Sequence, residues 1–320
     1  MATTIPAATA TEARLHRLNT ASARRLLDPD EVVAGTLGPG QILPDELLTV
    51  IDLGLDLGPE QRARLSREEV AAIVDYGLRF EAVLMAGFSL RIIDAPDLTD
   101  PRITYLLHEM GEETRHSRLF VRLIDQLAPT GRNPFLHGPP RLAIRVGIRF
   151  VIDLPALLFT LVLGGEEIPD LIQKLAGGHP DTDPFVRAVN HYHRQEEARH
   201  IAFARLVLAE VWATAGPVDR RAVRTIAPRV IHGMWDQLVH PGVYATVGLP
   251  RWATWWAVRH SPTRVALRRR ATRPVLDALV EAGVLRPGRI PRGWRTLCGV
   301  DRHARPLPDP AGTAPVATSI

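Results

Sequence analysis

The chain has 320 residues, 46% of them hydrophobic and 23% charged, which is typical of a globular protein with a large core. The 39 basic and 35 acidic side chains leave a net charge of only +4, so the charge does not indicate a nucleic-acid partner, and we expect none. The single cysteine, Cys298, excludes an intrachain disulfide and a cysteine-based metal or iron–sulfur site.

Apolar residues recur at helical spacing along most of the chain. Ser66 and Glu69 have the pattern of a capping box, which predicts a helix start, and Pro155 and Pro169 are expected to kink a later helix. Runs of alternating β-branched residues are almost absent, so the pattern predicts an all-α protein. The predicted helices cover about residues 11–27, 66–93, 102–127, 141–176, 184–214 and 218–238.

The composition changes along the chain, and the C-terminal part is rich in Arg, Trp and Pro. We predict an N-terminal helix and arm, a helical bundle, short Arg/Trp-rich helices packed on the bundle, and a flexible tail, at residues 1–34, 35–240, 241–300 and 301–320.

The N-terminal residues contain no apolar stretch flanked by basic residues, so we expect no signal peptide. The longest apolar run, residues 151–165, is shorter than a membrane span and contains Asp153 and Pro155. Together with the low cysteine content, these features predict a cytoplasmic protein with no membrane segment.

The segment HYHRQEEARH, residues 191–200, places two imidazoles and a carboxylate on one face of a predicted helix. His193, Glu197 and His200 stand at i, i+4 and i+7, so they project together. One such triplet is equally consistent with an ordinary polar face. A second helix, however, carries Glu-x-x-His spacing in EETRHS, where Glu113 precedes His116 by three residues.

Two Glu-x-x-His pairs on separate helices are what a carboxylate-bridged dinuclear metal site needs, provided that two further helices each add an inward glutamate. Glu81 interrupts an apolar stripe, where an unpaired carboxylate would be costly to bury. At the end of the apolar run, Glu166 or Glu167 fits, and helical spacing does not decide between them. The alternative is a bundle whose polar residues are buried in pairs without a metal.

The order Glu81, Glu113-x-x-His116, Glu166, His193-x-x-x-Glu197-x-x-His200 resembles the p-aminobenzoate N-oxygenase (AurF-like) family of ferritin-like di-iron oxygenases. The histidine one turn before the second Glu-x-x-His is the most specific feature, because generic ferritin-like proteins lack it. The resemblance covers about residues 40–240. It implies a ferritin-like four-helix bundle core with additional N- and C-terminal helices.

The resemblance also implies a ligand set and a cofactor. Glu166 is preferred to Glu167 because its distance along the chain to His193 is similar to that in the family. Two iron ions are implied, although these ligand types barely discriminate iron from a mixed Mn/Fe pair. The implied metal ligands, which are also the catalytic residues, are Glu81, Glu113, His116, Glu166, His193, Glu197 and His200.

The implied activity is that of a di-iron, O2-dependent monooxygenase of secondary metabolism, which oxidises the nitrogen of a small aryl amine towards the hydroxylamine and nitro levels. Its implied partners are O2, the amine, an external electron donor and a second copy in a homodimer. One alternative is a di-iron or Mn/Fe oxidase, hydroxylase or desaturase acting on another small molecule. Another is a non-enzymatic, ferritin-like metal-handling protein.

Three further interpretations concern residues around the predicted site. The arginines of residues 251–296 are either a solvated helix face or a docking patch for an acidic electron donor such as a ferredoxin. Asp153 is either an acceptor for a ligand histidine or a residue at a helix end facing water. Glu112 and Glu196 each precede a ligand glutamate, and we expect both to be exposed and paired with arginine.

Overall fold

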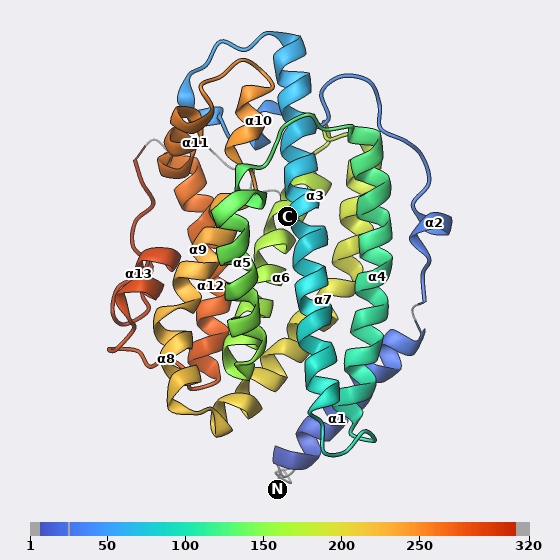
Figure 1. Ribbon diagram of the computed structural model, residues 1–320, viewed down its shortest axis with the longest axis vertical. Helices are drawn as coiled ribbons and strands as arrows, with labels where there is room; N and C mark the ends of the chain where they lie inside the picture. The colour runs from blue at the N-terminus through green and yellow to red at the C-terminus, as the bar shows by residue number, and fades with distance from the viewer. Residues whose placement is uncertain (1–6, 25, 312–320) are drawn as a thin grey trace, which may run out of the picture.

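The computed structural model describes residues 7–24 and 26–311, which are predominantly helical and contain no strand beyond one isolated bridge (Figure 1). The all-α prediction is therefore confirmed. The α-helices are α1 (Ala7–Arg24), α2 (Pro29–Val32), α3 (Pro59–Ile93), α4 (Pro101–Leu127), α5 (Gly138–Ile152), α6 (Pro155–Gly178), α7 (Pro184–Thr214), α8 (Pro217–Thr225), α9 (Ala227–Gln237), α10 (Pro241–Ala245), α11 (Arg251–His260), α12 (Pro262–Glu281) and α13 (Arg292–Cys298). Short 3-10 helices lie at η1 (Asp45–Leu47), η2 (Ile51–Leu53) and η3 (Pro134–Leu136).

Four long helices, α3, α4, α6 and α7, form the central bundle (Figure 1). Helix α3 packs along α4, and α6 packs along α7, so the bundle consists of two helix pairs. A short connection joins the helices within each pair, whereas the segment that contains α5 joins one pair to the other. The remaining helices surround this bundle, with α1 against α4 and α7 and with α8, α9 and α12 against α6. This is the predicted four-helix core with additional N- and C-terminal helices.

Proline occupies the first position of every bundle helix, where its missing N–H costs no helical hydrogen bond. Asp100 caps α4 by accepting from the backbone N–H of Arg102, and Asp183 caps α7 by accepting from Phe185. These two caps, one on each pair of helices, place the starts of the segments that carry the Glu-x-x-His motifs.

Helix α3 begins at Pro59, so the capping box predicted at Ser66 and Glu69 is wrong. The side chain of Gln61 accepts a hydrogen bond from the Gly58 N–H and so performs the end capping. Ser66 lies inside the helix, where its hydroxyl donates to the Ala63 carbonyl and accepts from the Ile42 N–H. The capping-box prediction failed at Ser66 because its hydroxyl group binds a loop that packs on the helix, and not a helix end.

The helix predicted over residues 141–176 is two helices, α5 and α6, which meet at 116°. Pro155 disfavours helical backbone at the preceding residue, so it breaks the helix instead of kinking it. Asp219 of α8 then accepts from the Ala156 and Leu157 N–H groups and caps α6. The helix predicted over residues 218–238 is likewise divided, into α8 and α9, whereas α6 continues through Pro169.

The C-terminal helices share a core with the bundle. Leu163 of α6, Ile231 of α9, Leu276 of α12 and Trp294 of α13 belong to one buried cluster. The expected tail begins with hydrogen-bonded structure, since the Leu307 N–H donates to the Gly299 carbonyl. The last part of that tail, residues 312–320, lies outside the described residues.

Among the described helices, none is by itself long and apolar enough to cross a membrane. The successive helices α5 and α6 reach that length and composition only as a pair, and the pair is sharply bent.

Candidate metal centre

All seven predicted site residues converge inside the bundle, and none is more than 5% exposed. Each bundle helix contributes at least one side chain to this cluster. The contributions are Glu81 from α3, Glu113 and His116 from α4, Glu166 from α6, and His193, Glu197 and His200 from α7.

Two carboxylates lie at the centre of the cluster, each between two imidazoles. The Oε2 atom of Glu113 is 3.3 Å from Nδ1 of His116, and its Oε1 atom is 3.2 Å from Nδ1 of His200. The Oε1 and Oε2 atoms of Glu197 are each 3.5 Å from the same two nitrogens. A carboxylate that reaches two such donor groups is suited to bridge a pair of cations.

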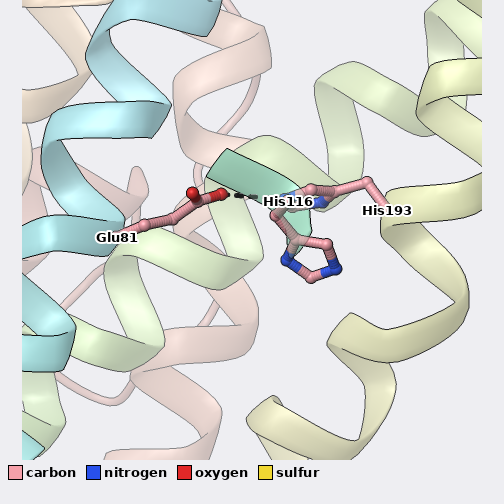
Figure 2. Close-up of side chains that lie close together, drawn as sticks. All are labelled: Glu81, His116 and His193. Atoms are coloured by element: carbon pink, nitrogen blue, oxygen red, sulfur yellow. Dashed lines mark ion pairs between the residues drawn. The ribbon is translucent and has the colours of Figure 1, made fainter. Parts of the chain in front are cut away.

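Ligand-type atoms of the cluster also form two groups, one of which includes the central carboxylate of Glu197. We call the group of Glu81, His116 and His193 position 1 and the group of Glu166, Glu197 and His200 position 2; within each, one atom per residue lies within 4.8 Å of the others. Figure 2 shows position 1, where Glu81 and His193 point toward one another, with Oε1 to Nε2 at 3.5 Å, and His116 lies beside them.

Several buried atoms of this cluster lack a hydrogen-bond partner among the described residues. They include one oxygen each of Glu81 and Glu113, both oxygens of Glu197, and Nδ1 of His200. Unpaired buried polar atoms are costly, and cations placed between them would remove that cost. The donor set, carboxylates and imidazoles, fits iron or manganese, so the residues present fit a dinuclear metal site.

The family of the chain follows from comparison of the whole sequence. The family model described as p-aminobenzoate N-oxygenase AurF matches residues 8–283, most of the chain. This chain belongs to the AurF family. Membership indicates N-oxygenase-type function at the level of the family.

Among curated proteins, the AurF-family chain is similar to uncharacterized proteins of Mycobacterium bovis and Mycobacterium tuberculosis. The identity is 27% over 187 residues, which covers 57% of this chain and 53% of each relative. The matched part therefore spans about half the length of these relatives.

In the AurF-family chain, the outward nitrogens of two imidazoles are held by acids of the opposite helix. Nε2 of His116 on α4 lies 2.9 Å from Glu196 on α7, and Nε2 of His200 on α7 lies 2.7 Å from Glu112 on α4. Such contacts fix the ring orientation and direct Nδ1 inward. An arginine pairs with each acid, at 3.0 Å for Arg115–Glu196 and 2.8 Å for Arg199–Glu112.

The predicted exposure of Glu112 and Glu196 is therefore wrong, although their arginine pairing is confirmed; they are only 2% and 3% exposed. Asp153 is exposed at the end of α5, so the interpretation as a histidine acceptor is wrong and the helix-end interpretation holds. Glu166 points into the cluster, whereas Glu167 pairs with Arg205 at 2.7 Å.

Two further polar residues, which sequence reasoning missed, hold ligand-type side chains at position 1. The buried Gln173 places its Oε1 atom 3.0 Å from Nδ1 of His193, so it accepts that proton and leaves Nε2 facing inward. Ser117 donates to Oε2 of Glu81 at 2.6 Å. Helical spacing is the available signal, since Ser117 follows Glu113 by four residues.

The protonation of the cluster reflects burial and mutual contact. Burial lowers the pKa of His116, but hydrogen bonds to Glu113 and Glu196 outweigh it and raise the pKa to about 10. Burial, together with the neighbouring Glu197, raises the pKa of Glu166 well above its usual range. These side chains must lose protons when a cation binds, so metal uptake releases protons.

A mostly apolar cavity of about 90 Å³ abuts the cluster, and Glu81, Glu113, Glu166 and His193 form part of its wall. A second cavity of about 650 Å³ lies beneath α5. The residues that line both cavities are Tyr76, Phe80 and Met234. The two cavities are therefore adjacent and are separated by these side chains. This arrangement is suited to admitting a small molecule toward the metal positions.

Proposed function

We propose that this chain is a di-iron, O2-dependent monooxygenase that oxidises the nitrogen of a small aryl amine towards the hydroxylamine and nitro levels. The observation that carries the proposal is the buried cluster of carboxylates and imidazoles with an apolar cavity against it. Membership of the AurF family supports the reaction type. A metal-handling protein of the ferritin type would have no use for such a cavity.

In this proposal, seven side chains hold two iron ions, which when bound supply the O2-activating chemistry. Glu113 and Glu197 would contact both ions, because each carboxylate lies close to both inner imidazoles. Glu81, His116 and His193 would hold the ion at position 1, and Glu166 and His200 would hold the ion at position 2.

The protein around the metals binds and orients the amine. The walls of the smaller cavity include Phe80, Ile172 and Met234, which exclude water and offer contact to an aromatic ring. The polar part of the wall is the ligand cluster, so the amine nitrogen is expected to face it. The buried acid–arginine pairs keep their own charges balanced on the far side of the imidazoles.

Each first oxidation converts one amine, one O2, two electrons and two protons into one hydroxylamine and one water, so an external reductant is needed. We propose an acidic donor such as a ferredoxin. Several arginines of residues 251–296 are used internally; for example, Arg259 pairs with Asp236 at 2.6 Å, and Arg264 lies over the ring of Trp235. The arginines of this segment that remain exposed are Arg251, Arg270, Arg286, Arg289 and Arg292.

The reductant proposal is tested by rates. Donor-supported turnover should fall as ionic strength rises, because salt screens attraction between exposed charges. Replacing the exposed arginines by glutamine should reduce the rate with the protein donor but leave it unchanged with a small chemical reductant. A donor-supported rate that ignores salt would contradict the proposal.

The activity is tested by metal analysis followed by single turnover. We expect about two iron ions per chain, and the reduced protein mixed with 18O2 and a panel of aryl amines should give N-oxygenated products that carry the label. Oxygen inserted at carbon, or loss of two hydrogens, would establish the hydroxylase or desaturase alternative instead. Manganese in one position would identify a Mn/Fe pair. Iron uptake without any turnover would favour metal handling.

A further inference from the structure

One buried acid at the cluster has no role in the function proposed above. Glu109 of α4 is 0% exposed, and both its carboxylate oxygens lack a hydrogen-bond partner among the described residues. An unpaired carboxylate in a helical core is costly and seldom kept without a binding partner. Glu69, another fully buried glutamate, shows the usual solution, since Thr49 donates to it through both its N–H and its hydroxyl group.

Glu109 occupies a special place in the repeat of the two ligand helices. On α7, His193, Glu197 and His200 stand at i, i+4 and i+7. On α4, Glu109, Glu113 and His116 stand at the same spacing. Because this spacing puts all three side chains on one helix face, Glu109 is the counterpart on α4 of His193 on α7.

The same correspondence holds in space. His193 lies beside the imidazole of the opposite helix, with its ring centre 4.3 Å from that of His116. Glu109 also lies beside the imidazole of the opposite helix, since one ligand-type atom from each of Glu109, Glu113 and His200 lies within 4.8 Å of the others. Each metal position thus has one extra side chain from the turn before a Glu-x-x-His motif.

Without Glu109 the two positions are unequal. Beside Glu113 and Glu197, position 1 would have three further side chains, Glu81, His116 and His193, whereas position 2 would have only Glu166 and His200. We propose that Glu109 is a further protein ligand, which binds the metal ion at position 2 together with His200 and Glu113. This inference rests on the dinuclear centre of the proposed function, but not on its substrate.

The charge of the centre gives a second consequence. Four ligand carboxylates balance two divalent ions, and the buried acids Glu112 and Glu196 are already balanced by Arg199 and Arg115. When bound to an ion, the carboxylate of Glu109 would therefore add a negative charge that the described surroundings do not balance. That charge would stabilise the trivalent state of the ion at position 2 relative to the divalent state.

The test compares anaerobic Fe(II) binding and 57Fe Mössbauer spectra of wild type, Glu109→Gln and Glu69→Gln. We expect Glu109→Gln to weaken binding of one of two Fe(II) equivalents at least tenfold, to change the spectrum of one iron only, and to make the reduction potential more positive. Glu69→Gln, which also replaces a buried glutamate by its amide, should bind both equivalents as wild type does. Glu109→Asp keeps the charge and should give an intermediate affinity.

The outcomes separate this inference from the proposed function. Two irons of wild-type affinity with an unchanged spectrum in Glu109→Gln would overturn ligation by Glu109 and leave the di-iron proposal intact. Failure of the wild-type chain to bind a second iron would overturn the di-iron centre itself. If Glu109→Gln does not fold, the shorter side chain of Glu109→Asp decides, because a ligand shifted by one methylene must alter the spectrum of one iron.

Discussion

His116 and His200 are each held by an acid that belongs to the other Glu-x-x-His helix, and this exchange ties α4 to α7 at the metal positions. The acids are Glu196 and Glu112, which are also bound by Arg115 and Arg199. Because a fixed ring keeps its Nδ1 atom directed inward, these contacts organise the site before a metal arrives.

Replacing either outer acid should therefore weaken metal binding. We expect Glu112→Gln and Glu196→Gln each to lower Fe(II) affinity by about 10–100-fold, the usual effect of losing such a partner. Competition with a chromogenic chelator measures this. Glu167→Gln is the matched control, because that acid neighbours a ligand but pairs outward with Arg205. Equal affinities in all three variants would contradict the assigned role.

A second prediction concerns the pH dependence of stability. Burial raises the pKa of Glu69 from 4.5 to about 7, against hydrogen bonds from Thr49 that lower it. The native state therefore keeps this proton at higher pH than the unfolded chain, so stability is lost as pH rises from about 4.5 to about 7. The difference is at most about 3 kcal/mol.

Glu69→Gln removes this titration. Relative to that variant, wild type should have a higher free energy of unfolding at pH 5 than at pH 8, as measured by urea denaturation at both values. The same difference between the two proteins at both pH values would count against the buried, protonated carboxyl group.

The residues of the cluster could be predicted because helix geometry alone decides which positions share a face. Glu113 and His116, three residues apart, lie on one face of a helix whatever surrounds it. Exposure could not be predicted in the same way. Glu112 and Glu196 look like surface acids, since nothing local shows that a second helix covers them. Glu109 was missed, although its spacing from Glu113 repeats that of His193 from Glu197.

At the scale of elements, α6 approaches α3 closely because it has glycine beside its ligand-type glutamate. A Cβ atom at Gly165 would lie 1.7 Å from Cζ of Phe80, so the Phe80 ring lies directly against the α6 backbone. That ring also forms part of the partition between the two cavities.

Gly165→Ala should displace the Phe80 ring and destabilise the protein by about 1–3 kcal/mol, the usual cost of overpacking. Gly111→Ala on α4 is the control; no atom lies within 4 Å of its Cβ position, so higher helix propensity should stabilise it by about 0.5–1 kcal/mol. Urea denaturation measures both. If both alanine variants were more stable than wild type, the Phe80 ring would be able to move without loss of folding free energy, contrary to this prediction.

Helix α5 should be less protected than α6. Val151 is its single buried residue, whereas most of α6 is buried, and a cavity of about 650 Å³ lies beneath α5. Hydrogen–deuterium exchange should be faster in residues 138–152 than in residues 155–178, because helices with few buried contacts open at low free energy. Equal protection in both helices would show that α5 is as firmly held as the bundle.

The long helices were predictable from apolar spacing, and α7 extends over the range expected for it. Their boundaries were predictable only where the end residues act alone. Pro184 and Asp183 mark a start by themselves. The start of α3 is capped by Gln61, and the start of α6 is capped by Asp219, which lies 63 residues along the chain from Ala156.

At the scale of the whole molecule, metal binding and folding should be linked. The buried carboxylates that lack partners among the described residues would gain them from cations, which are expected to bind the native chain and not the unfolded one. Free metal at 100 times its Kd would add about 2.7 kcal/mol per site. Anaerobic Fe(II) should therefore raise Tm, and a chelator should reverse this.

A variant with both bridging acids replaced, Glu113→Ala with Glu197→Ala, is the control and should show no Fe(II)-dependent rise. If neither Fe(II) nor the chelator changed the Tm of the wild-type chain, the expected link between metal binding at the cluster and folding stability would be contradicted.

Helix α1 takes part in this arrangement through Ser22, whose hydroxyl group accepts a hydrogen bond from Nε of Arg199 at 3.1 Å. Arg199 binds Glu112, and Glu112 binds His200. A shortened protein that kept only α3, α4, α6 and α7 would lack Ser22 and would expose Arg199 to water. The contact of Arg199 with Glu112, and through it the orientation of the His200 imidazole, would then be less firmly fixed. Helix α1 is therefore expected to be needed for a well-ordered His200 in any shortened form of the chain.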